Sequence, residues 1–292
     1  MRDQLLVKPA PRPRRFAPVA LVRNLPFHVV AAVFSLLFLL PLYWFVISTT
    51  KDASQLYQGT LTLGSPNHFI HDNLTGVFAF QNGVFGLWLV NSFLYAGVGA
   101  LVGTFVAALA GFAFRRYGFF GKRLLFVLIL GFALVPPFAT ALPLFSIFRD
   151  FGLLDTRWSV LIPSLVNVFG VYLMVVYWNQ VPDELFDAAM IDGANDVTIF
   201  FRVGLPNILP GFTTLILLAF VTIWNNYFLP LVMLSDSAKY PLIRGIITIT
   251  SLLGFPIYNL NIMGAFLTSI PLLIMFLVMQ RFLAPQLTGA VR

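Results

Sequence analysis

Long apolar runs are the feature that most limits how this 292-residue chain can fold. Crossing ~30 Å of hydrocarbon as a helix takes about 20 consecutive apolar residues. No Asp, Glu, Lys or Arg interrupts the six runs of that length, which lie at about 27–49, 86–111, 124–147, 158–179, 208–233 and 260–280. The sequence therefore predicts an all-α polytopic membrane protein with six transmembrane helices, in which residues 27–292 form one transmembrane domain.

The charged residues, only 10% of the chain, indicate the orientation of these helices. Six Lys or Arg residues lie in the N-terminal segment 1–26, four follow the second run, one follows the fourth and two follow the sixth, thirteen of the 18 in all. The five others lie in the alternate loops. Because basic loops stay in the cytoplasm, both termini are expected to be cytoplasmic in a multi-pass protein of the cell membrane. This distribution accounts for the net charge of +7 without a nucleic-acid partner.

A polar stretch at 182–206 separates the fourth and fifth runs and has the pattern of two short helices. Pro182 suits the first position of a helix, and the two carboxylates that follow it favour the positive end of the helix dipole. Gly193 stands where a left-handed residue ends a helix. Asn195 or Asp196 can then cap the second helix. We therefore expect a helix–turn–helix unit at the cytoplasmic surface.

Both predicted helices have a face suited to contact. Helical spacing places four residues on one face of the first helix, namely Leu185, Ala188, Ala189 and Asp192. The centre of that face is small, so another helix or subunit can approach it closely. The second helix is predicted to have an apolar face made of Val197, Phe200 and Phe201. These residues alone fit a docking element and a solvated helix pair without a partner equally well.

The matching stretches of this loop are Val181-Pro182, Glu184-Leu185, Asp187-Ala188-Ala189, Asp192-Gly193-Ala194 and Leu205-Pro206. Together they resemble the EAA loop of ABC importer permeases, and most closely its form in the carbohydrate-uptake branch typified by the smaller maltose permease subunit. Asp187 stands where the family usually has Glu, which keeps the charge but shortens its reach. Two further stretches are similar to that branch, namely Trp224-Asn225-Asn226-Tyr227 with Pro230-Leu231, and the C-terminal residues 280–292.

The resemblance implies a type I ABC importer permease fold, in which loop 182–206 docks on an ATP-hydrolysing subunit. The residues it assigns to docking are Glu184, Leu185, Asp187, Ala188, Ala189, Asp192, Gly193, Ala194 and Pro206. The implied partners are a second permease subunit, two ABC ATPase subunits, an extracytoplasmic solute-binding protein and the lipid bilayer. ATP and Mg²⁺ belong to the ATPase, and no cofactor, metal or enzymatic activity is expected on this chain.

The sequence agrees that another chain hydrolyses ATP. Of the four lysines only Lys122 follows a glycine, and Arg123 comes after it where a phosphate-binding loop would have Ser or Thr. No carboxylate lies within the six runs, which argues against an ion-driven secondary carrier and favours a cargo without strong net charge.

Neutral polar and aromatic side chains within the runs are candidates for a carbohydrate path, because amides bind hydroxyls and rings stack on sugar faces. The candidates are Asn91, Asn167, Trp224, Asn225, Asn226 and Tyr227. Each of them also suits helix–helix hydrogen bonding. We therefore predict a permease subunit that imports a sugar or related polyol. The alternatives are an importer for another solute, such as glycerol phosphate or a polyamine, and a secondary carrier.

Overall fold

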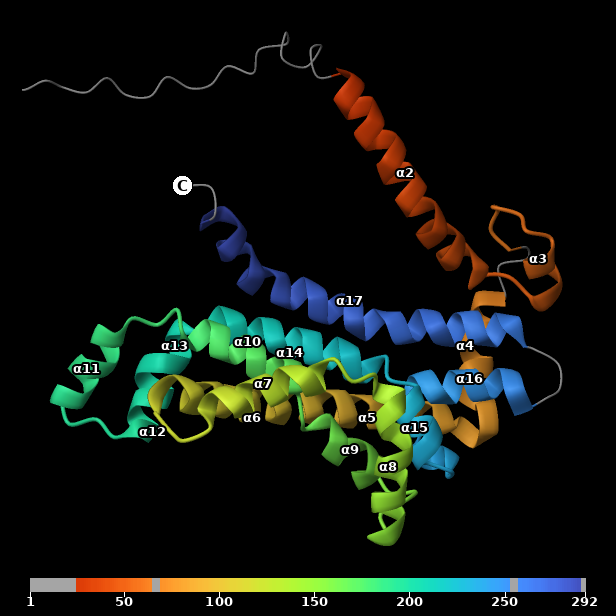
Figure 1. Ribbon diagram of the computed structural model, residues 1–292. Helices are drawn as coiled ribbons and strands as arrows, with labels where there is room; N and C mark the ends of the chain where they lie inside the picture. The colour runs from red at the N-terminus through yellow and green to blue at the C-terminus, as the bar shows by residue number, and fades with distance from the viewer. Residues whose placement is uncertain (1–24, 65–68, 253–256, 290–292) are drawn as a thin grey trace, which may run out of the picture.

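The computed structural model describes residues 25–64, 69–252 and 257–289, and these ranges hold helices and no β-strand. The expected N-terminal segment 1–26 falls almost wholly outside them, as does the end of the C-terminal tail. Helices α6, α10 and α14 run alongside one another through the centre, with α17 beside α14. The helix α2 leaves this bundle at one end (Figure 1).

The principal helices, in chain order, are α2 (Leu25–Ser48), α3 (Ala53–Tyr57), α4 (Phe69–Ala79), α5 (Val84–Phe93), α6 (Gly99–Arg116), α7 (Lys122–Ala133), α8 (Pro137–Asp150), α9 (Trp158–Ser164), α10 (Val168–Trp178), α11 (Asp183–Ile191), α12 (Asp196–Thr198), α13 (Leu205–Asn207), α14 (Leu209–Trp224), α15 (Phe228–Met233), α16 (Leu242–Leu252) and α17 (Tyr258–Gly289). One π-helical turn, Leu94–Val98, joins α5 to α6, and another, Ile199–Gly204, joins α12 to α13.

The all-α membrane fold is confirmed. Four helical stretches are long and apolar enough to cross a bilayer, namely Pro26–Ser48, Phe69–Arg116, Trp158–Trp178 and Tyr258–Gln280. Two pairs of sharply bent helices bring the number to as many as six. The predicted runs therefore correspond to helices, but the third, fourth and fifth runs are each interrupted, the fourth at residues 165–167 between α9 and α10.

The third run is interrupted at two of its prolines, and the fifth run ends earlier than predicted. Helices α7 and α8 meet at 102°, because Pro136 and Pro137 lack the N–H groups that would continue a helix and disfavour helical backbone before them. The fifth run was predicted to continue to residue 233. Instead α14 ends at Trp224, residues 225–227 are not helical, and α15 begins at Phe228. The helix α16 lies in a segment that was assigned to an external loop.

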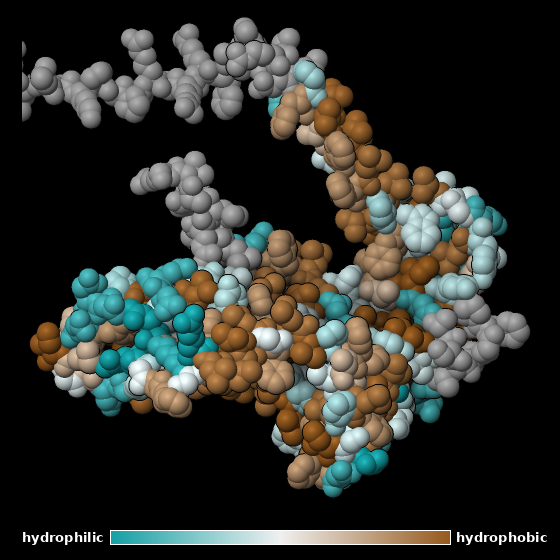
Figure 2. All heavy atoms as spheres, viewed as in Figure 1, coloured by the Kyte–Doolittle hydropathy of each residue, from teal (hydrophilic) through white to brown (hydrophobic). Residues whose placement is uncertain are grey.

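The side chains gather into two buried clusters, one at each end of the central bundle. One surrounds Trp88, Tyr95 and Trp224, and the other surrounds Trp178 and Phe200. In contrast, every side chain of α2 from Pro26 to Trp44 is exposed in the isolated chain. Figure 2 shows apolar surface over α2 and the central bundle, and hydrophilic surface over the end that carries α11 and α12. That end is the one suited to an aqueous compartment.

Candidate coupling loop and membrane pocket

The first helix of the polar loop, α11, has one buried and one exposed side. Pro182 is its N-cap, so the helix begins at Asp183, one residue later than predicted. Phe186 and Ala189, at 4% and 9% exposure, belong to the cluster around Trp178. Ala188 is exposed. The prediction that Ala188 and Ala189 share an outward face is therefore wrong, because Ala189 faces the rest of this chain.

The turn after α11 forms as the sequence predicts. Gly193 has a φ of +77°, a left-handed conformation that favours glycine. The N–H of Ala194 donates to the carbonyl of Ala189 at 2.9 Å, which closes the end of the helix. The side chain of Asn195 then caps α12 by accepting from the N–H of Thr198 at 2.9 Å. Local signals alone therefore determine this turn.

The second half of the loop is held by Trp178 at the end of α10. The Trp178 ring lies 5.6 Å from the ring of Phe200, and its indole N–H donates to the carbonyl of Ala108 on α6 at 3.0 Å. Gly204 makes room for the same ring, since a Cβ there would lie 2.2 Å from it. Of the three residues predicted to form an apolar face, only Phe200 is buried, whereas Val197 and Phe201 are exposed.

Arg115, in the last turn of α6, contacts the beginning of α11. Its guanidinium forms an ion pair with Asp183 and lies 5.6 Å above the ring of Phe186. A terminal nitrogen also donates to the carbonyl of Val181 at 3.4 Å. A residue of the second span is thereby tied to the first arm of the loop.

The next residue, Arg116, contacts the second arm. Its Nε lies 3.5 Å from a carboxylate oxygen of Asp196, in the first turn of α12. The hydroxyl of Tyr117 donates to the other oxygen of Asp196 at 2.6 Å, and this hydrogen bond, together with burial, raises the pKa of Tyr117. The sequence analysis used Arg115 and Arg116 only as a signal of topology. The order of the spans already places them on the same side of the membrane as the polar loop.

The remaining residues assigned to docking divide by exposure. Most of them lie on the outer surface of the loop in the isolated chain, namely Glu184, Leu185, Asp187, Ala188, Asp192, Gly193 and Pro206. Ala194 is half-buried. Ile191 is 87% exposed and adds a large apolar side chain to this surface, which the sequence analysis did not assign. The exposed surface of α11 thus combines acidic side chains, a small side chain and large apolar side chains.

A second feature is a pocket of about 670 Å³ in the membrane-spanning part. It lies where three spans are interrupted, at the α7/α8 bend, between α9 and α10, and after α14. Its polar lining consists of Thr140, Ser164, Asn167, Thr222 and Asn226, and the other lining residues are apolar. Interrupted helices that line a cavity are a recurrent way of forming a binding site within a membrane protein.

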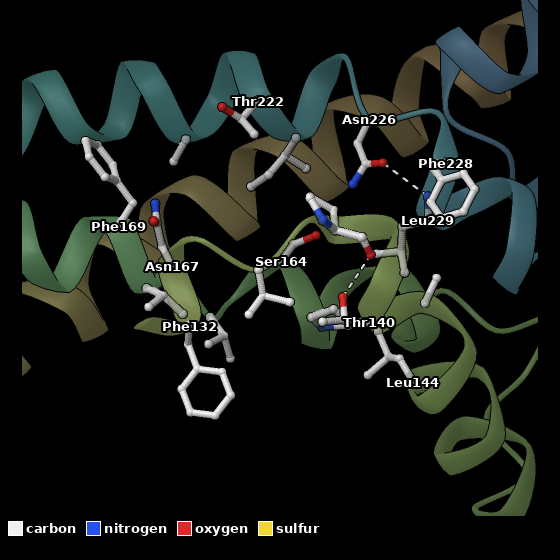
Figure 3. A pocket seen from close by; sticks show the side chains of 18 of the residues that line it. Phe132, Thr140, Leu144, Ser164, Asn167, Phe169, Thr222, Asn226, Phe228 and Leu229 are labelled. Carbon is white, nitrogen blue, oxygen red and sulfur yellow. Dashed lines mark hydrogen bonds between the residues drawn. The ribbon is translucent and has the colours of Figure 1, made fainter. Parts of the chain in front are cut away.

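Asn167 and Asn226 bring amides from two of these interruptions to the pocket (Figure 3). The Asn167 oxygen accepts from the N–H of Gly170 at 2.7 Å and caps α10. The Asn226 oxygen accepts from the N–H of Leu229 at 3.2 Å. Each amide oxygen thus satisfies a backbone group exposed by a helix break. The amide nitrogens are the groups that can donate to a ligand.

Asn225, Tyr227 and Trp224 are not among the residues that line the pocket. The Asn225 side chain donates to the carbonyl of Val221 at 2.9 Å. Trp224 is buried, and its indole N–H donates to the carbonyl of Thr268 at 3.3 Å. Of the predicted Trp-Asn-Asn-Tyr stretch, only Asn226 reaches the pocket.

Asn91, predicted for the cargo path, is not among the pocket-lining residues and instead binds another part of this chain. Its amide nitrogen donates to the carbonyls of Ala238 and Tyr240 at 2.8 and 3.2 Å, and its oxygen accepts from Arg157 at 3.1 Å. It therefore fixes the loop after α15, which lies at the end of the bundle away from α11. The sequence could not predict the contact with this loop, because the two carbonyls lie about 150 positions away from Asn91.

The same loop is held by Asp155, between α8 and α9. A carboxylate oxygen accepts from the N–H groups of Ser235 and Asp236 at 3.0 Å, and the other lies 3.2 Å from the ammonium of Lys239. Burial raises the pKa of Asp155, but these donors outweigh it and hold that pKa below its ordinary value. The loop is thus anchored by an ionised carboxylate.

Comparisons with known proteins agree with one another. Residues 99–289 match the family described as "binding-protein-dependent transport system inner membrane component". The arabinooligosaccharides transport system permease protein of Bacillus subtilis (strain 168) is 29% identical over 276 residues, which cover 94% of this chain and 97% of that protein. The sn-glycerol-3-phosphate transport system permease protein of Yersinia pestis bv. Antiqua (strain Antiqua) is 29% identical over 260 residues, covering 87% and 92%.

A solved structure supports the same architecture. The crystal structure of a bacterial ABC transporter involved in the import of the acidic polysaccharide alginate contains a chain that superposes with a TM-score of 0.75. The two chains are 23% identical, and the match covers 92% of this chain and 99% of that one. At this identity the likeness establishes the fold.

Proposed function

The chain belongs to the binding-protein-dependent transport system inner membrane components, and from this premise we propose that it is a permease subunit that imports a sugar or related polyol. In this proposal a separate ATPase subunit docks on loop 182–206 and hydrolyses ATP with Mg²⁺. A second permease subunit completes the path, and an extracytoplasmic solute-binding protein delivers the cargo. Both termini and the loop lie in the cytoplasm.

The observation that carries the docking proposal is the exposed surface of α11. Ala188 leaves room for a close approach, and Leu185 and Ile191 flank it with apolar area that is exposed in the isolated chain. The opposite side of α11 is fixed to the chain by Phe186 and Ala189. A helix that is anchored on one side and partly apolar on the other is suited to a helix-in-groove contact with a partner.

The pocket supports a neutral, hydroxyl-rich cargo. Two amide groups, on Asn167 and Asn226, and three hydroxyls accompany apolar walls, and no charged side chain is among the lining residues in the described ranges. Each hydroxyl of Thr140, Ser164 and Thr222 already donates to a carbonyl of its own helix. Their oxygens are therefore suited to accept from a ligand, and the amide nitrogens to donate to one.

The second candidate cargo is glycerol phosphate, which the likeness to the Yersinia permease favours. Phosphate recognition ordinarily uses Arg or Lys, or the N–H groups of a helix N-terminus. Because no basic side chain is among the lining residues of the pocket in the described part of the chain, the neutral cargo is the better fit to this subunit.

Uptake by the assembled transporter in proteoliposomes tests the cargo proposal. Asn226→Ser keeps an oxygen that can accept from the N–H of Leu229 but removes the amide donor. Loss of one hydrogen bond should lower sugar uptake at limiting cargo by roughly two- to twelvefold. Asn225→Ser is the matched control, since that amide does not line the pocket. Equal uptake by parent and Asn226→Ser would remove the pocket from the cargo path.

Crosslinking tests the docking proposal, because the chain contains no cysteine. A cysteine introduced by Ala188→Cys should crosslink to a cysteine on the ATPase surface. Ala189→Cys is the matched control, because that neighbouring position is buried against this chain and should not react. If both variants stay uncrosslinked across a panel of ATPase cysteines while uptake is normal, α11 is not the docking helix.

A further inference from the structure

The end of α6 holds both arms of the coupling loop, although neither arm adjoins α6 in sequence. Arg115 contacts the first turn of α11 through Asp183, and Arg116 contacts the first turn of α12 through Asp196. Both carboxylates lie at helix N-termini, where their charge is favoured by the helix dipole as well. One exposed ion pair alone contributes little, but these two act together with the bond from Tyr117 to Asp196.

The other end of α6 contacts the lining of the pocket. A Cβ at Gly103 would lie 3.2 Å from the carbonyl oxygens of Ser164 and Leu165, and a Cβ at Gly99 would lie 3.0 Å from the Cβ of Ser164. The backbone of α6 therefore lies directly against the interruption between α9 and α10. Ser164 itself lines the pocket, and so does Asn167 three residues later.

The two contact regions are joined by a continuous helix. The helix α6 has 18 residues without an internal break, a length of about 27 Å at 1.5 Å per residue. In contrast, the loop is connected to α14 through a bend of 81° at its C-terminal side. A displacement of the loop can be absorbed at that bend, whereas α6 offers a straight and closely packed connection.

We propose that Arg115 and Arg116 are positioning residues that make α6 and the coupling loop move together. A displacement of α11 by its docking partner is thereby carried along α6 to the interruption at Ser164 and Leu165, and so to the pocket. This inference rests on the proposed function, since it assumes that loop 182–206 docks on an ATPase. It adds a route from that loop to the cargo pocket through the second span.

The test uses the complete transporter in proteoliposomes, with uptake and ATP hydrolysis measured on the same preparation. The double variant Arg115→Gln/Arg116→Gln removes both charges at similar side-chain length. Uptake per ATP hydrolysed should fall by about two- to thirtyfold, the range for residues that carry coupling between sites. The double variant Arg115→Lys/Arg116→Lys should recover part of that loss. Arg123→Gln, which removes one positive charge at an exposed position on α7, is the control for a basic residue outside these contacts and should resemble the parent.

Two further measurements keep the outcome decisive. When Ala188→Cys is added to the parent and to the double glutamine variant, the crosslink to the ATPase should form in both. If the crosslink is absent in the parent background, the docking proposal itself is overturned. If it forms in the double glutamine variant and uptake per ATP is undiminished there, only the role of the arginines is overturned. If the glutamine variant does not assemble, Arg116→Glu should impair uptake per ATP and the added change Asp196→Arg should restore it. A failure of that restoration also rejects the proposal.

Discussion

Gly111 offers a quantitative test of how closely α6 packs against α10. A Cβ built at this position would lie 2.8 Å from the Cβ of Met174, 2.8 Å from the Trp178 ring and 2.9 Å from the backbone carbon of Met174. Ordinary contact begins near 3.4 Å, so α6 and α10 must separate by roughly 0.6 Å, and backbone cannot move aside as a flexible side chain can. Gly111→Ala should therefore destabilise the chain.

The loss of stability in Gly111→Ala is measured against the same substitution at Gly97, a glycine in the same helical stretch. Gly97 has nothing within 4 Å of an added Cβ, so Gly97→Ala gains helix propensity without a clash. Both variants share that gain, and their difference isolates the overpacking, which costs about 1–3 kcal/mol. For a chain of this size the difference corresponds to roughly 2–12 °C in unfolding temperature.

The assay is thermal unfolding of the assembled transporter in nanodiscs, with the parent and both variants side by side. Gly111→Ala should unfold below Gly97→Ala, and amide hydrogen exchange should increase in α11–α13, because Trp178 bonds Ala108 and also contacts the loop. Unfolding temperatures within 1 °C of each other for the two variants would refute the close approach of α6 and α10 at this position.

Three further expectations concern topology, the turn and pH. Reporter fusions at Gly64 and Asn195 should lie on opposite sides of the membrane, and finding them on one side would exclude an odd number of spans between them. Gly193→Val should weaken ATPase association in pull-down, since a β-branched residue at φ +77° is strained by roughly 1–2 kcal/mol. The stabilisation that ionised Asp155 gives to the loop after α15 should be complete above the ordinary carboxyl pKa of about 3.9. It should be lost as the pH falls through the lower pKa of Asp155 in the folded chain. In the parent, the accessibility of that loop to protease should rise as the pH falls through this pKa. Asp155→Asn should remove this pH dependence.

Features that depend on neighbouring residues were predictable from the sequence. The end of α11 at Gly193 and the cap by Asn195 each involve groups within a few positions of one another, so composition and spacing determine them. The same holds for the interruption at Pro136 and Pro137, because proline removes a backbone donor wherever it occurs. The 102° angle of this bend was not predictable, because local residues do not specify the distant helix α15 that α8 contacts.

Features that depend on distant partners were not predictable. Ala188 and Ala189 are chemically identical, and only the position of Trp178 and Phe200 decides which of them is buried. Asn91 was assigned to the cargo path because an amide in an apolar run suggests a ligand. Its partners lie in a loop that the sequence does not bring near it.

The two pocket amides show how a helix interruption and a binding site arise from the same residues. Breaking a span in the membrane exposes backbone N–H groups that must find an acceptor. Asn167 and Asn226 supply it with their oxygens, which orients each side chain and leaves its nitrogen to contact a ligand. The donors of this subunit are therefore fixed by the fold before any cargo enters. A ligand that offers acceptors to these nitrogens, and donors to the three hydroxyl oxygens, is complementary to these five groups, and sugar hydroxyls can do both.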